Sequence, residues 1–145
     1  MFKTILVPTD GSELSDKAID IAVRFAAGGG ARLVALSVAE PQTTPYLAEG
    51  STVVDAEYYA RKVQEIAQAN VDKAEAAART AGVPCEKVVR TSINPYEEIV
   101  KAAQEFGCDA IFMASHGRKG LSALFVGSET QKVLARSTIP VLVVR

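Results

Sequence analysis

The chain has little of what a metal or disulfide site requires. It contains one histidine, His116, and two cysteines, Cys85 and Cys108, which stand far apart and form no Cys-x-x-Cys pair. No metal site is therefore expected, and two isolated thiols are typical of a reducing cytosol. Both thiols are predicted to pack as small apolar groups near the starts of strands.

The net charge of the chain is also small, and long apolar runs are lacking. The 145 residues carry a formal charge of −1, and no Lys/Arg cluster is interleaved with aromatic residues, which argues against an electrostatic nucleic-acid binder. No run approaches the roughly 18 apolar residues of a membrane span. Met1–Pro8 has one basic residue and too short an apolar run for a signal peptide. We expect a cytoplasmic protein without nucleic-acid or membrane partners.

Short apolar runs alternate with segments of helical periodicity. The runs show little polar alternation, as expected for strands buried on both faces of a parallel sheet. They are Thr4–Val7, Arg32–Val38, Cys85–Arg90, Ala110–Ala114 and Pro140–Val144. The β-α-β-α order predicts one α/β domain over residues 1–145, with an open, doubly wound, five-stranded parallel sheet and helices on both faces.

The predicted helices have clear end signals. N-cap residues precede three of them, and a capping-box side chain follows in two cases: Ser12, Asn94 with Glu97, and Ser128 with Gln131. Glycines close the first helix at Gly28–Gly30 and the second, which starts near Ala56, at Gly82. Their predicted apolar faces contain Leu14, Ala18, Ile21, Ala22 and Phe25, and then Tyr59, Val63, Ile66, Ala67, Val71, Ala74 and Ala78. Glu40–Asp55 shows no period and is predicted to be a loop or lid.

Two unusual loops, Pro8–Glu13 and Ala114–Val126, follow predicted strands. The second carries glycines and the cations Arg118 and Lys119, and it leads into a helix that opens with Gly127. Free N–H groups and the positive end of the helix dipole suit an anion there. One ligand reaches both loops only if strands one and four are neighbours, which predicts the strand order 3-2-1-4-5. The Walker spacing is absent, so an ordinary P-loop NTPase is not expected.

The same residues resemble a known family. Gly117, nine residues and then Gly127-Ser128 are similar to the second half of the Gly-x2-Gly-x9-Gly-Ser/Thr nucleotide motif of the universal stress protein family, whose first glycine is replaced by Ala114. Val7–Glu13 is similar to the family's opening signature, and Pro140–Val144 to its closing strand. The resemblance implies the same strand order and a dimeric, cytosolic stress-response module that binds ATP with Mg²⁺.

The resemblance also implies which residues bind the nucleotide. Asp10 would accept hydrogen bonds from a ribose hydroxyl or the adenine amino group. Pro8 and Thr9 would line the adenine pocket through backbone groups, next to Val38. The remaining candidates belong to the second loop and the helix after it: Met113, Ala114, Ser115, His116, Gly117, Arg118, Gly120, Gly127, Ser128, Glu129 and Thr130.

Several of these residues have a purely structural interpretation as well. Asp10 is a natural turn residue, and loops use glycines such as Gly117 and Gly127 for positive φ. Ala114 costs little at negative φ and about 1 kcal/mol or more at positive φ. Glu129 places a carboxylate in the first turn of the helix meant to hold phosphate, where it could compete with the ligand.

Three functions remain open from the sequence. The leading one is an ATP-binding regulatory or sensing module without catalytic residues, because no Ser or Cys nucleophile stands at a recognisable spacing from His116. The alternatives are a ligand-free dimerisation module and a slow ATPase. A homodimer is expected through the apolar strand Val141–Val144, which is an edge in the predicted order and has nothing after Arg145 to cover it.

Overall fold

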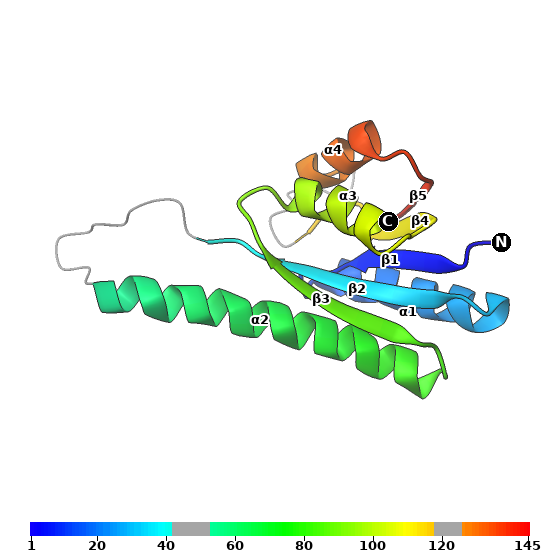
Figure 1. Ribbon diagram of the computed structural model, residues 1–145, viewed down its shortest axis with the longest axis horizontal. Coiled ribbons are helices and arrows are strands. Elements are labelled where there is room, and N and C mark those ends of the chain that lie inside the picture. Colours follow the sequence, from blue (N-terminus) through cyan, green and yellow to red (C-terminus); the bar gives the residue numbers. More distant parts are fainter. Residues whose placement is uncertain (42–52, 118–125) are drawn as a thin grey trace.

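The computed structural model describes residues 1–41, 53–117 and 126–145, and its strands form one parallel sheet (Figure 1). The sheet order is β3-β2-β1-β4-β5, which confirms the predicted order. The elements are β1 (Thr4–Pro8), α1 (Glu13–Gly29), β2 (Arg32–Ala39), α2 (Val53–Thr80), β3 (Cys85–Thr91), α3 (Pro95–Glu105), β4 (Ala110–Ala114), α4 (Ser128–Arg136) and β5 (Val141–Val144).

Helices cover both faces of the sheet, as predicted. Figure 1 shows α1 and α2 on one side and α3 and α4 on the other. Because neighbouring side chains of a strand point to opposite faces, Ile5 and Phe112 pack beneath α1 and α2, whereas Leu6 and Ile111 pack beneath α3 and α4. All four are fully buried, so the core consists of two apolar layers separated by the sheet.

The first helix begins and ends where its capping residues predict. Ser12 Oγ accepts a hydrogen bond from Ser15 N, and Gly30 closes the helix at φ 70°. The buried face differs in part from the predicted one. Ala18 and Ala22 are buried as predicted, but Ile19, Val23 and Ala26 are buried in place of Leu14, Ile21 and Phe25. Phe25 is 38% exposed, and its ring contacts Phe112 edge-to-face and Phe2 at a tilt.

The second helix is longer than the sheet that it covers. Its 28 residues extend about 42 Å at 1.5 Å per residue, whereas a strand such as β2 spans only about 26 Å. Its C-terminal half buries Ala67, Val71, Ala74 and Ala78, as predicted. The N-terminal part runs past the sheet (Figure 1), so the predicted inward positions Tyr59 and Ile66 are exposed.

The starts of α3 and α4 differ from the predicted capping boxes. Asn94 occupies the N-cap position of α3, but its side chain makes no capping hydrogen bond. The N-cap of α4 is Gly127 and not Ser128, and the Gln131 side chain donates to the carbonyl oxygen of Val126. The cap of α3 comes from another helix and is described with the site below.

Both cysteines lie beside strand starts, as predicted. Cys85 begins β3 and Cys108 precedes β4 in the core. Burial raises the pKa of both thiols, that of Cys108 to about 11. Across the described ranges, no helix combines the length and apolarity that a membrane crossing would need.

Candidate functional site

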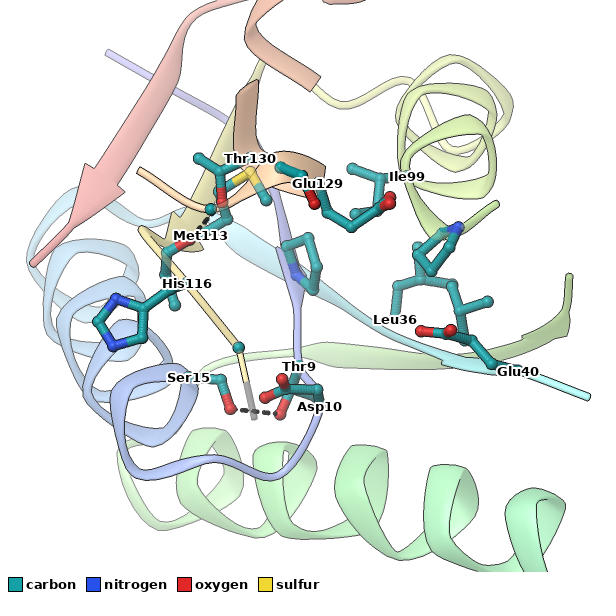
Figure 2. A pocket seen from close by; sticks show the side chains of 17 residues that line it. Thr9, Asp10, Ser15, Leu36, Glu40, Ile99, Met113, His116, Glu129 and Thr130 are labelled. Atoms are coloured by element: carbon teal, nitrogen blue, oxygen red, sulfur yellow. Dashed lines mark hydrogen bonds between the residues drawn. The ribbon is translucent and has the colours of Figure 1, made fainter. Parts of the chain in front are cut away.

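A cavity of about 440 Å³ lies at the carboxyl ends of β1, β2 and β4, beside α3 and α4 (Figure 2). The chain runs from β1 to β2 on one side and reaches β4 on the other, so this is the switch point at which open α/β sheets bind ligands. Its described lining residues are Pro8, Thr9, Asp10, Ser15, Leu36, Val38, Glu40, Pro95, Ile99, Met113, Ala114, His116, Gly117, Gly127, Ser128, Glu129 and Thr130.

Residues from both predicted loops therefore line one cavity. Every predicted site residue that the structure describes lies in this lining, apart from Ser115. Arg118, Lys119 and Gly120 lie outside the described residues, as does most of the predicted loop Glu40–Asp55. As ligand contacts, these residues remain predictions.

The β1–α1 loop is fixed by a buried polar network. The N–H of Thr9 donates to Leu36 O at 2.8 Å, and its carbonyl oxygen accepts a 2.8 Å hydrogen bond from Ser37 Oγ. The Thr9 hydroxyl lies 3.1 Å from Ser15 Oγ. The N–H of Thr9 is thus already used within the fold, which leaves its carbonyl oxygen as the group with a second lone pair for a ligand.

Asp10 stabilises a turn and also lines the cavity, so its turn role and its proposed ligand role are compatible. Its Oδ1 accepts a 3.0 Å hydrogen bond from Ser12 N, the Asx turn expected of a turn residue, and Gly11 follows at φ 78°. The same side chain lines the cavity. The turn holds the carboxylate in place at the cavity wall.

Ala114 introduces no backbone strain. It ends β4, and no described residue other than glycine has a positive φ. Its carbonyl oxygen accepts a 2.9 Å hydrogen bond from the hydroxyl of Thr130, which is 3% exposed. The Thr130 proton is therefore engaged within the fold, and this hydroxyl ties α4 to the end of β4.

Close packing explains Gly117 and Gly127. Neither has a positive φ, so the conformational interpretation of these glycines is wrong; Gly127 has φ −62°. A Cβ on Gly127 would lie 3.1 Å from Ser115 O and 3.2 Å from His116 Cα, and one on Gly117 would collide with Asp10 Oδ2. The two glycines let the loops approach each other.

Ser115 and His116 form a contact that residue spacing did not indicate. Ser115 Oγ lies 3.2 Å from His116 Nδ1. However, Ser115 is 3% exposed and lies outside the cavity lining, and its N–H donates to Val144 O at 2.8 Å. Ser115 joins β4 to β5 and is too buried to meet a ligand as a nucleophile.

Glu129 joins the starts of two helices. Its Oε2 accepts a 2.9 Å hydrogen bond from the N–H of Tyr96, in the first turn of α3, and its Oε1 lies 3.5 Å from Lys132 Nζ. Glu129 therefore caps α3, which its own N-cap side chain leaves uncapped. Sequence reasoning could not foresee this pair, since the two residues are separated by 33 positions.

Five lining residues were not predicted: Ser15, Leu36, Glu40, Pro95 and Ile99. Two of them carried a usable signal. Leu36 lies two residues before Val38 on the same face of β2, and Ile99 lies four residues after Pro95 on one face of α3. Within the described parts of the chain, no group of three or more His, Cys, Asp or Glu side chains is placed to hold a metal ion.

The structure is a doubly wound α/β domain with a cavity at its switch point, the place where open α/β sheets bind their ligands. The model of the universal stress protein family matches residues 1–145, and the chain belongs to that family. A universal stress protein of Thermus aquaticus is 38% identical over 145 residues, which is all of both chains.

Two solved structures extend the comparison. The structure of MJ0577 from Methanocaldococcus jannaschii superposes with a TM-score of 0.83 at 30% identity, covering 99% of this chain and 96% of that one. A universal stress protein solved in complex with cAMP has a TM-score of 0.72 at 28% identity, covering 99% and 97%. These relatives share the fold along its whole length.

Proposed function

We propose that the chain binds an adenine nucleotide, ATP with Mg²⁺, in the cavity and acts as a cytoplasmic regulatory or sensing module of the stress response. The observation that carries this proposal is the meeting of the β1–α1 loop and the start of α4 at one cavity. Its volume lies within the roughly 300–1,000 Å³ usual for small-ligand sites. The relative solved with cAMP supports an adenine nucleotide as the ligand class.

The lining offers both apolar and polar groups to a ligand. Pro8, Leu36 and Val38 offer apolar contacts for a base, and the Asp10 carboxylate can accept hydrogen bonds from a ribose. The helix α4 begins at Ser128, and first-turn N–H groups have no acceptor within their own helix. Phosphate oxygens fit this end, and Mg²⁺ would enter with them and offset their charge.

The same geometry supports binding rather than efficient turnover. The hydroxyl beside His116 is buried and outside the cavity lining. An adjacent base and nucleophile that a substrate cannot reach do not form a catalytic pair. We therefore propose at most a slow ATPase.

The proposed dimer uses β5. This strand is an edge of the sheet, and Leu142 is 40% exposed. The carbonyl oxygens of Pro140 and Val144 accept hydrogen bonds from the β4 side. Because strand residues alternate, the N–H and C=O groups of Val141 and Val143 point away from β4, towards a second copy of β5.

Calorimetric titration with Mg-ATP tests the binding proposal, and we expect about one site per chain. Val38→Trp should weaken binding at least tenfold, about 1.4 kcal/mol, because the indole takes up space in the cavity that Val38 lines. Ile93→Trp is the matched control, since Ile93 is 57% exposed and lies outside the lining. Absence of binding at millimolar ATP would favour the ligand-free dimerisation module.

A further inference from the structure

The cavity contains a resident negative charge that is fixed in position. The Glu129 carboxylate lies in the first turn of α4 and reaches across to the first turn of α3 (Figure 2). Pro95 has no N–H, and the Asn94 side chain makes no capping hydrogen bond. The Tyr96 N–H is therefore bound by Glu129 and by no cap of its own helix, and this contact holds the carboxylate at the cavity wall.

The described part of the cavity lining contains acidic side chains. Of the described residues that line it, Asp10, Glu40 and Glu129 carry carboxylates and none is Lys or Arg. Lys132 lies 3.5 Å from Glu129 Oε1, but the two side chains are 51% and 39% exposed, so Lys132 compensates the carboxylate only weakly. A ligand that brings further negative charge to the start of α4 is repelled by this carboxylate, although water at its exposed side screens part of the repulsion.

We infer that Glu129 is a specificity-determining residue, which disfavours phosphate charge that no cation compensates. The site then takes ATP as its Mg²⁺ complex and rejects the metal-free form. This inference rests on the proposed nucleotide site and assigns to Glu129 a selection among the charge states of the ligand. The hydrogen bond from the Tyr96 N–H fixes the position of the Glu129 carboxylate. Because Glu129 lines the cavity, its charge can act on a bound ligand.

Glu129→Gln separates these two roles. The amide oxygen of glutamine still accepts the Tyr96 N–H, so α3 keeps its cap, while the negative charge is removed. Glu13→Gln is the matched control, because Glu13 lies in the first turn of α1, is exposed and is absent from the described lining. The melting temperature of each variant reports whether the fold is retained.

The experiment measures dissociation constants for adenosine, for ATP with EDTA and for Mg-ATP in all three proteins. We expect Glu129→Gln to tighten metal-free ATP roughly tenfold relative to adenosine, the size of one nearby unit charge, and to tighten Mg-ATP less. The inference is overturned if Glu129→Gln changes the ratio of the adenosine affinity to the metal-free ATP affinity by less than threefold from the wild-type ratio. It is also overturned if Glu13→Gln changes this ratio as much as Glu129→Gln does. If neither wild type nor variant binds any of the three ligands, the proposed function fails with it.

Discussion

At Gly127 the two ends of the β4–α4 connection meet. Its N–H donates to Ser115 O at 2.6 Å, and its Cα faces the backbone of Ser115 and His116 so closely that no side chain fits without movement. Any larger residue at this position acts first on the packing of the loop and only then on the ligand. A loss of binding in such a variant would not by itself identify a phosphate site.

The expected effect of Gly127→Ala is therefore a loss of stability. Overpacking against backbone atoms should lower the free energy of unfolding by about 1–3 kcal/mol, measured by urea denaturation without ligand. Gly28→Ala is the control. It lies within α1 with no atom near its Cβ position, so it should raise the stability by about 0.5–1 kcal/mol. Equal stabilities of Gly127→Ala and wild type would contradict this prediction and show that the backbone of Ser115 and His116 can shift at little cost.

Single residues also show how far sequence reasoning reaches. Ser12 and Asp10 act through neighbours two or three positions away, so their cap and turn could be predicted from the local sequence. The partner of Thr130 is the Ala114 carbonyl, on another element. Contacts of this kind depend on how elements pack, and a single sequence does not specify that packing.

Among the elements, β1 is tied to β4 by a side chain as well as by the sheet. The Asp109 carboxylate, just before β4, accepts hydrogen bonds from Lys3 N at 2.8 and 3.1 Å and from Thr4 N at 3.1 Å. Burial opposes ionisation of this carboxyl, but the backbone donors outweigh burial and lower its pKa. The ionised form is therefore favoured by folding.

Asp109→Asn should accordingly reduce stability in a pH-dependent way. A lowered pKa contributes stability above the unfolded value of about 3.9, and the contribution is lost as pH falls through the folded pKa. At pH 7 we expect a loss of about 1 kcal/mol, and the difference from wild type should shrink below about pH 4. Thermal denaturation across pH 2.5–7 measures it, and a difference that grows on acidification would contradict the assignment.

The elements were more predictable than their inward faces. The central strands β1 and β4 were recognisable because both faces are buried and the runs are apolar throughout. The expectation of burial on both faces is wrong for the edge strand β3, whose Glu86 and Lys87 are exposed. The long helix was recognisable too, but its inward face was assigned along its full length. Residues 56–62 are exposed because the strands are too short to reach them, a length mismatch that the helical pattern alone does not reveal.

For the whole molecule, the edge strand gives a direct test of assembly. Val143→Pro removes an N–H that points away from β4, so pairing within the chain should persist while pairing with a second copy is lost. Leu142→Pro, whose N–H faces β4, is the comparison and should destabilise the fold itself. Sedimentation should show a wild-type dimer at tens of micromolar and a folded Val143→Pro monomer. A monomeric wild type would reject this interface.

The central place of β1 has a consequence for the order of events during synthesis. β1 pairs with β2 soon after both have been made, but its other edge pairs with β4, whose residues come near the end of the chain. Until then the nascent sheet has an apolar edge along Ile5 and Leu6 and only one wall of the cavity. Closing this long-range contact is expected to be the slow step of folding. A nucleotide that binds only the closed form would shift the equilibrium towards that form.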